Sequence, residues 1–322
     1  MSSRVLLLVT NSFDTTADLI VHRLGADKVF RLNFDIWSDY SFEITPSGFR
    51  IADPTGRAVD QSMVAKVLWR KPWSRVPFRP SSRTDEDRYY DQEVWYAIRD
   101  LVNLLWLENR IVLVEPYADQ RAGKFVQMRV AAKHLQVPPY QFRLRLPSTF
   151  PAADPVVVKS LTTEPVGPRE ERQLLFTTKV DDHELSPDCP WMVQSYVHAD
   201  KDITVAFVRD RLFAFELDRA SFRDRTADWR EMPVDWEAGK WRPHELPADV
   251  ERCITRFMDE MGLQFGRLDF LLGPDGYCFL EVNANGEWAW LDTEGRHGLL
   301  PKVVHEIDPA TERYPVPMRR RP

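Results

Sequence analysis

The N-terminal third of the chain alternates short apolar runs with polar turns. Val5–Thr10 is an almost uninterrupted apolar run, which is the pattern of a buried strand. Asn11, Ser12 and Asp14 then supply N-cap candidates for a helix over Thr15–Leu24. Further extended segments, bounded by proline and glycine turns, are expected at 28–32, 42–44 and 64–69. A strand followed by a helix predicts an α/β opening to a strand-rich first domain.

The pattern changes to helical spacing in the middle of the chain. From 84 to 108 no glycine or proline occurs and apolar residues recur every three or four positions, which predicts a long amphipathic helix. A strand is expected at 111–114 and a second helix at 119–135, ending before Pro138. Short apolar runs then predict strands of a second sheet at 156–159, 174–178, 192–196, 203–208 and 212–216.

A helix and a hairpin are predicted in the last third. The helix covers 248–261, and the hairpin strands 267–272 and 277–283 flank the turn sequence Gly-Pro-Asp-Gly. If the loop has three residues, Asp269 lies opposite Glu281 across the hairpin. Side chains alternate along a strand, so Glu281 and the residue two positions later share one face.

Composition and charge exclude several classes of protein. The 322 residues are 43% hydrophobic and 29% charged, as in globular proteins of two or three domains. The 43 basic and 49 acidic residues give a net charge of −6, which disfavours non-specific binding of nucleic acid. Three cysteines fit neither a disulfide framework nor a zinc site, and the first apolar run is too short for a membrane span. We therefore expect a soluble cytoplasmic protein with no nucleic-acid or membrane partner.

Several common enzyme signatures are absent. The sequence has no phosphate-binding G-x-x-x-x-G-K-[ST] loop, no G-x-G-x-x-G fingerprint, no H-E-x-x-H and no G-x-S-x-G. The cluster from His198 to Asp202 has metal-ligating residue types, but a charged loop before a strand is usually solvated. The functional residues are therefore expected elsewhere in the sequence.

The hairpin carries the strongest chemical signal. Asp269, Glu281 and Asn283 would converge on one face of its two strands. Magnesium prefers oxygen ligands and commonly bridges carboxylates to nucleotide phosphates, so this set suits a magnesium nucleotide. The alternative is a surface hairpin with scattered acids. The strands are strongly apolar, and a carboxylate on such strands is costly to bury unless it is paired or metal-bound, which favours the functional interpretation.

The run from Phe279 to Trp288 resembles the closing motif of the ATP-grasp enzymes. The similarity is greatest to the branch that matures graspetides, which are ribosomal peptides cross-linked through ω-ester or ω-amide bonds. Further matching segments follow in order along most of the chain: Trp69-Arg70-Lys71-Pro72, Val157-Val158-Lys159, Val193-Gln194-Ser195-Tyr196-Val197, Asp202-Ile203-Thr204-Val205 and Asp228-Trp229-Arg230.

The resemblance implies a fold and a domain division. It implies an α/β (α+β) ATP-grasp fold in which an N-terminal α/β domain precedes central and C-terminal lobes that sandwich ATP. The corresponding residues are 1–117, 118–196 and 197–322. It also implies ATP and Mg²⁺ as cofactors, with Asp269, Glu281 and Asn283 as metal ligands.

The resemblance also implies contacts to the nucleotide. Lys124 and Lys159 would reach its phosphates, with a solvated or snorkelling lysine as the alternative at either position. Gln194, Tyr196 and Val197 would form the hinge that meets the adenine edge, with a plain core strand as the alternative. Asp202 would face the ribose hydroxyls unless it is simply an exposed acid at a strand start. Many relatives have Glu in place of Ser195 and Arg in place of Thr204, so neither position is taken as a site.

Two arginines are the implied catalytic residues. Arg230 lies in the Asp-Trp-Arg motif of the peptide-maturing branch and would contact phosphate oxygens or the developing acyl phosphate. Arg267 lies on the same strand face as Asp269 and would serve similarly, with a structural salt bridge to Asp269 or Glu281 as an equal alternative. The motif also departs from its commoner form at Ala284 and Glu287, where many relatives have Pro and Gln.

The implied reaction joins two side chains of one peptide. A carboxylate of a ribosomal precursor peptide, made of a leader and a core, would be activated as an acyl phosphate and captured by a hydroxyl or amine. The segment Trp69–Pro72 would help to recognise the peptide, or is equally a buried strand end. The resemblance further implies a homodimer. The rivals are a ligase that adds a free amino acid or amine to a carboxylate, and a non-catalytic nucleotide-binding or peptide-binding protein.

Overall fold

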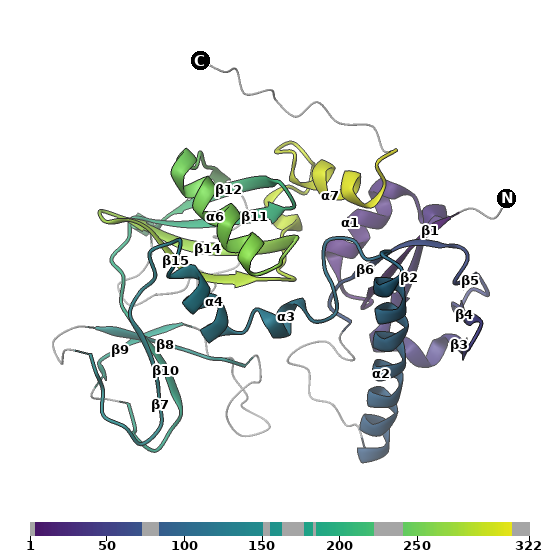
Figure 1. Cartoon of the computed structure of the whole chain (residues 1–322), viewed down its shortest axis with the longest axis horizontal. Helices are drawn as coiled ribbons and strands as arrows, with labels where there is room; N and C mark the ends of the chain where they lie inside the picture. Colours follow the sequence, from purple (N-terminus) through teal and green to yellow (C-terminus); the bar gives the residue numbers. More distant parts are fainter. Residues whose placement is uncertain are drawn as a thin grey trace.

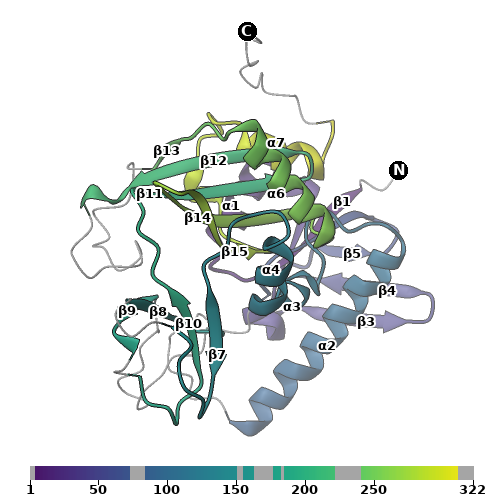
Figure 2. The ribbon, with the colours of Figure 1, turned by 60° about the vertical axis from the view of Figure 1, so that its left-hand side comes forward.

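The computed structural model describes residues 4–72, 84–150, 155–162, 177–182, 185–221 and 241–310. Within these residues the strands form four sheets. Figure 1 shows the first part of the chain on one side of the molecule, with a four-stranded and a five-stranded sheet on the other. Both sheets are antiparallel, and Figure 2 shows the four-stranded sheet below the five-stranded one.

The first domain is built around a buried parallel sheet. β1 (Val5–Thr10) lies between β2 (Val29–Asn33) and β6 (Val64–Trp69), and all six residues of β1 are buried. α1 (Thr15–Leu24) follows β1, and the Asp14 side chain caps its first turn. This arrangement confirms the α/β opening. A small antiparallel sheet extends the domain and contains β3 (Ser41–Thr45), β4 (Gly48–Ala52) and β5 (Ala58–Asp60).

The long predicted helix is present, but the strand expected after it is not. α2 (Asp85–Leu107) begins after Thr84, whose hydroxyl accepts from the backbone N–H of Asp87 in a capping box. The prediction of a strand at 111–114 is wrong, because Ile111 makes an isolated bridge to Val67. Leu113 has φ +63°, a left-handed conformation that cannot continue an extended strand.

The prediction of a single helix at 119–135 is wrong. The structure has α3 (Ala118–Arg121) and α4 (Lys124–Ala131) in its place. Gly123 has φ −57° and ψ 147°, an extended conformation that interrupts the helical hydrogen bonds. As a result, Lys124 is the first residue of a new helix. Its position matters for the site described below.

The central part of the chain forms the four-stranded sheet. Its order is β7-β10-β8-β9, with β10 in contact with both β7 and β8. The strands are β7 (Tyr140–Arg143), β8 (Val156–Lys159), β9 (Thr178–Val180) and β10 (Trp191–Ser195). Most of the strand predicted at 174–178 lies outside the described residues.

The C-terminal part forms the five-stranded sheet. Its order is β13-β12-β11-β14-β15, and neighbouring strands run antiparallel. The strands are β11 (Lys201–Val208), β12 (Arg211–Asp218), β13 (Arg242–Pro243), β14 (Phe265–Gly273) and β15 (Gly276–Asn283). The predicted helix is α6 (Ala248–Glu260), which packs Phe257 against Phe279 of β15 with ring centroids 5.0 Å apart.

The hairpin of β14 and β15 has the predicted pairing but not the assumed loop. Its turn contains two residues between Gly273 and Gly276, so the assumption of three is wrong. A register shift after Asp269 adds one residue to β15 and restores the pairing of Asp269 with Glu281. The bulge thus brings the two carboxylates opposite each other.

One hydrophobic core joins the first domain to the five-stranded sheet. α7 (Leu299–Ile307) buries most of its apolar residues in this core, next to α1 and β11. Among the described residues, the buried apolar side chains of β8 and β10 lie outside that core, whereas Tyr140 of β7 packs against it. None of the described helices has the length and apolar character needed to cross a membrane.

Candidate functional site

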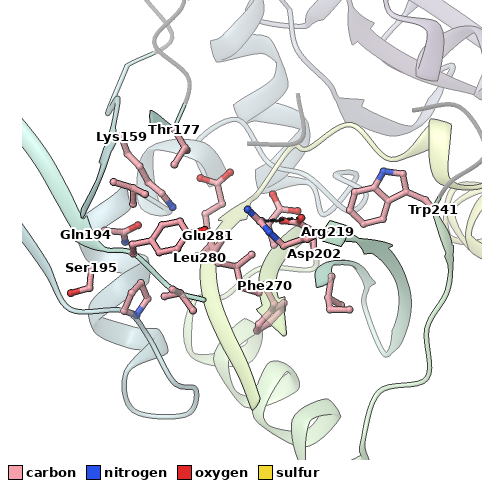
Figure 3. A pocket seen from close by; sticks show the side chains of 17 residues that line it. Lys159, Thr177, Gln194, Ser195, Asp202, Arg219, Trp241, Phe270, Leu280 and Glu281 are labelled. Atoms are coloured by element: carbon pink, nitrogen blue, oxygen red, sulfur yellow. Dashed lines mark hydrogen bonds and ion pairs between the residues drawn. The ribbon is translucent and has the colours of Figure 1, made fainter. Parts of the chain in front are cut away.

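A pocket lies between the four-stranded and the five-stranded sheet (Figure 3). Its lining combines apolar side chains with polar and charged groups, which is the usual character of a small-molecule site. The apolar lining comes from both sheets and from the segment before β7: Pro138, Val157, Ile203, Phe270, Leu271 and Leu280. Seven of the residues predicted from the sequence also line it: Lys159, Gln194, Tyr196, Val197, Asp202, Asp269 and Glu281.

The four-stranded sheet contributes the end of β8 and the end of β10. Lys159 is the last residue of β8 and pairs with Met192 across the sheet. Gln194 of β10 is fully buried, and its Nε2 lies 3.9 Å from the sulfur of Met128. Its Oε1 has no hydrogen-bond partner among the described residues. A buried acceptor without a donor is costly, so this oxygen marks a place where a ligand N–H would be stabilised.

The five-stranded sheet contributes a carboxylate held by an arginine. Arg219 donates from Nη1 to both carboxylate oxygens of Asp202, each at 3.0 Å. Both side chains are largely buried, so the alternative that Asp202 is an exposed acid is wrong. Figure 3 shows this pair beside the pocket, with Trp241 beyond it. Arg219 is a site residue that was not predicted from the sequence, because no local pattern marks an arginine after a strand.

Asp269, Glu281 and Asn283 form an acidic cluster on one face of the hairpin. The Asn283 amide donates from Nδ2 to Asp269 Oδ2 at 3.4 Å and to Glu281 Oε1 at 3.3 Å. Thr204 of β11 donates from Oγ1 to Asp269 Oδ1 at 2.9 Å. In the part of the chain that the structure describes, no three His, Cys, Asp or Glu side chains group in a metal-binding arrangement. The acidic cluster has two carboxylates and one amide, all oxygen-bearing groups.

Two cations flank the acidic cluster. Lys124, at the start of α4, pairs directly with Glu281. Its side chain is mostly buried, so the alternative of a solvated helix lysine is wrong. Arg267 donates from Nη2 to Asp269 Oδ2 at 3.1 Å, which is one of the two salt bridges considered for it. Its Nη1 donates to the backbone carbonyl of Glu287 at 3.1 Å. The two positive charges balance the two carboxylates.

The cysteines take no part in this arrangement. All three are free, in agreement with the expectation of no disulfide. Cys278 is a buried residue of β15, and burial raises the pKa of its thiol to about 11. The thiol therefore stays protonated near neutral pH and is poorly suited to act as a nucleophile or a metal ligand.

No protein-family model matches the sequence, and no curated protein matches it. Solved structures are similar over nearly the whole chain. Macrocyclase MdnC from Microcystis aeruginosa MRC, bound with precursor peptide MdnA, has a TM-score of 0.74 at 21% identity, over 94% of this chain and 98% of that chain. The RiPP-associated ATP-grasp ligase of Chryseobacterium gregarium, in complex with ADP and a leader and core peptide, has a TM-score of 0.78 at 21% identity, over 96% of this chain and 98% of that chain.

A third similar structure is ATP-grasp ligase PsnB, complexed with a phosphomimetic variant of its minimal precursor, Mg and ADP. Its TM-score is 0.68 at 14% identity, over 95% of this chain and 100% of that chain. Such full coverage in both chains leaves one conclusion for the architecture. This chain has the ATP-grasp fold. The fold class predicted from the hairpin motif is therefore confirmed, while the boundaries after residues 117 and 196 stay predictions.

The ATP-grasp fold brings most of the predicted site residues together. The pocket gathers those of the hinge, the β8 lysine and the two carboxylates of the acidic cluster, and Asn283, Lys124 and Arg267 contact that cluster. Arg230 lies outside the described residues. Trp69 and Arg70 are buried, as expected for the alternative of a buried strand end at the Trp69–Pro72 segment.

Proposed function

We propose that the chain is an ATP-dependent ligase that cross-links a ribosomal precursor peptide, as in graspetide biosynthesis. The observation that carries this proposal is the pocket between the two sheets of an ATP-grasp fold. It combines an unpaired buried acceptor at Gln194, a lysine at the end of β8 and the carboxylates of the acidic cluster. The similarity to structures that contain precursor peptides supports the peptide as the substrate class.

The residues present fit a purine nucleotide. The free Oε1 of Gln194 is an acceptor for the exocyclic amino group of adenine. The Tyr196 N–H already donates to the Pro155 carbonyl, so the Tyr196 carbonyl and the backbone of Val197 would provide the further contacts along the hinge. The apolar lining matches the faces of a flat base. Asp202, oriented by Arg219, would accept hydrogen bonds from the ribose hydroxyls. Lys159 would meet the phosphates as a compact cation.

The acidic cluster fits Mg²⁺. Asp269 and Glu281 supply hard carboxylate oxygens, and Asn283 would supply its amide oxygen after a rotation of the amide group. Lys124, which now neutralises Glu281, would then be released toward the phosphates. A bound magnesium ion would neutralise phosphate charge during transfer. The observed pairing of Lys124 with Glu281 and its predicted contact with the nucleotide would therefore belong to two states of the site.

The reaction proceeds in two balanced steps. A carboxylate oxygen of an Asp or Glu side chain bonds to the terminal phosphorus of ATP, and the bond from that phosphorus to ADP breaks. A hydroxyl or amine of the same peptide then bonds to the acyl carbon, loses its proton, and phosphate leaves. The guanidinium of Arg267, with that of Arg230, would stabilise the negative charge that develops on the transferred group. The enclosing sheets would keep water from the activated carboxyl.

The precursor peptide would enter as leader plus core, and the enzyme would act in the cytoplasm with Mg²⁺ and ATP. We also propose a homodimer, as the resemblance to the peptide-maturing branch implies. Because Arg70 is buried, we do not expect it to contact the peptide directly.

Mass spectrometry of a candidate precursor peptide tests the proposal. The peptide is incubated with the protein, ATP and Mg²⁺, and phosphate release is measured in parallel. We expect the loss of one water mass for each ring, with one phosphate released per water. A gain equal to an amino acid or amine residue would assign the chain to the intermolecular ligases. Nucleotide binding without a change in peptide mass or phosphate would overturn the catalytic assignment for that peptide.

A further inference from the structure

A second set of charges lies under the loop that follows β15. We call Asp14, Arg70, Lys71 and Glu287 the ionic network. Arg70 is 3% exposed and places Nε 3.0 Å from Asp14 Oδ2, while its Nη2 contacts Glu287. Lys71 Nζ lies 2.7 Å from Glu287 Oε1. The network thus joins the end of β6 and the start of α1 to a residue more than 200 positions away in the chain.

Glu287 is held in its charged form. Burial acts to raise its pKa, but the charges of Arg70 and Lys71 and hydrogen bonds from Lys71 and Thr16 outweigh burial and lower the pKa to about 2. The Thr16 hydroxyl donates to Glu287 Oε2 at 2.7 Å. The carboxylate therefore has several partners, all from the first domain.

The backbone also supports this arrangement. Lys71 has φ +44°, a left-handed conformation that is rare and unfavourable for a lysine. Its carbonyl accepts a hydrogen bond from Asn11 Nδ2 at 2.7 Å, which ties the strained residue to the end of β1. Strain of this kind persists where the surroundings stabilise it and often lies at functional sites. Here it directs the ammonium group to Glu287.

The loop that carries Glu287 also touches the catalytic candidate Arg267. The Glu287 carbonyl accepts from Arg267 Nη1, and Nη2 of the same guanidinium contacts Asp269. A Cβ at Gly286 would lie only 2.9 Å from Arg267 Cβ and 3.1 Å from Asn283 Cβ, so the loop packs closely on both residues. A displacement of Glu287 is therefore transmitted to the guanidinium and to the acidic cluster.

We propose that Glu287 is a positioning residue, held by Lys71 and Arg70 of the first domain, that fixes Arg267 beside the acidic cluster. This inference rests on the proposed function for the role of Arg267. It assigns the Arg70-Lys71 segment to the support of the site from within the protein, in place of peptide contact. The negative charge of Glu287 matches the two cations that surround it.

Three variants test the inference: Glu287→Gln, Lys71→Met and the combination of the two. Lys28→Met is the matched control, because Lys28 also joins the first domain to the C-terminal part, through Asp308 at 3.2 Å, but near α7. Turnover of the precursor peptide gives kcat and the KM for ATP, and thermal unfolding reports stability. Hydrogen–deuterium exchange of residues 283–291, measured without ligands, reports on the loop itself.

We expect each single variant to lower kcat about tenfold with the KM for ATP changed less than about twofold, because misplacement of a catalytic group affects the reaction more than binding. The kcat of the double variant should fall no further than that of the more strongly affected single variant, because both substitutions remove the same ion pair between Lys71 and Glu287. An unchanged kcat, multiplicative losses, or a drop in unfolding temperature without a kcat effect would each overturn the inference.

The exchange measurement separates this inference from the proposed function. If the wild-type protein modifies no peptide, the proposed reaction is wrong. Faster exchange of residues 283–291 in both single variants, but not in Lys28→Met, would still show that Lys71 and Glu287 hold this loop in place. Unchanged exchange of that segment in the variants would refute the positioning role of Glu287, whatever reaction the protein catalyses.

Discussion

The acidic cluster and the ionic network lie at the two ends of one segment, residues 281–287, but they pair their charges differently. In the acidic cluster, two carboxylates face each other and share one amide donor at 3.3 and 3.4 Å. Their cations, on Lys124 and Arg267, reach in from the sides. In the ionic network, Asp14 and Arg70 are almost completely buried and each carboxylate has several close partners.

This difference indicates that the acidic cluster can accept a ligand, whereas the ionic network stabilises the fold. The ammonium group of Lys124, on a long flexible side chain, can leave the acidic cluster when a metal ion replaces its charge, with little loss of packing. Removing Arg70 from the ionic network leaves the buried carboxylate of Asp14 without a cation, which is strongly unfavourable. We therefore expect changes in the acidic cluster to affect turnover most strongly. Changes in the ionic network should affect stability and loop position and, through Arg267, lower turnover to a smaller extent.

The largest expected effect is on turnover. Glu281→Ala removes one of the two facing carboxylates and should lower Mg²⁺-dependent turnover at least about hundredfold, because a lost ligand weakens both metal affinity and charge neutralisation. Turnover is measured over a series of Mg²⁺ concentrations, with thermal unfolding to show that the variant folds. Asp275→Ala, in the turn of the same hairpin, is the control and should be nearly normal. Full activity of Glu281→Ala would refute the metal assignment.

The second prediction concerns stability. Arg70→Met leaves Asp14 buried without its cation and should lower the free energy of unfolding by about 3–5 kcal/mol. Urea unfolding followed by tryptophan fluorescence measures the change. Lys28→Met, which removes an exposed pair, should cost less than about 1 kcal/mol. Equal losses in the two variants would show that the ionic network is no more important than a surface contact.

The third prediction is a pH dependence. Because its folded-state pKa is about 2 and its ordinary value is 4.5, Glu287 stabilises the fold fully above pH 4.5, and this contribution is lost as the pH falls toward 2. The side chain is 40% exposed, so solvent reduces the contribution to about 1–2 kcal/mol. The stability difference between wild type and Glu287→Gln should therefore shrink as the pH is lowered from 4.5 to 2. A difference that stays constant over this range would contradict the charged pairing.

The smallest effect is expected from Thr204→Val. This change removes the 2.9 Å hydrogen bond to Asp269 and should weaken Mg²⁺ activation by roughly fivefold, corresponding to about 1 kcal/mol. Thr255→Val in α6, whose hydroxyl bonds to the backbone of the same helix, serves as the control. If the two variants have the same Mg²⁺ dependence as wild type, Thr204 does not help to orient Asp269.

Local patterns in the sequence predicted most of the elements and the residues of the acidic cluster. The pairing of Asp269 with Glu281 was predicted for a three-residue turn, and the structure reaches the same pairing with a two-residue turn and a bulge. The turn length was wrong because a bulge depends on packing across the sheet, not on the turn residues alone. The strand at 111–114 and the single helix at 119–135 were wrong because Leu113 and Gly123 adopt backbone conformations that tertiary contacts select.

The tertiary structure alone decided which distant charges meet. By itself, the sequence determined the fold class, through the resemblance of its motifs to the ATP-grasp enzymes. It also determined the residues of the acidic cluster, because side chains alternate along the two strands of one hairpin. The contact of Arg219 with Asp202, the position of Lys124 at Glu281 and the connection of Arg70 and Lys71 to Glu287 have no such local signature. These contacts arise because the packing of the sheets and helices brings together segments that are far apart in the chain. Charged side chains that become buried in this packing then require partners of opposite charge.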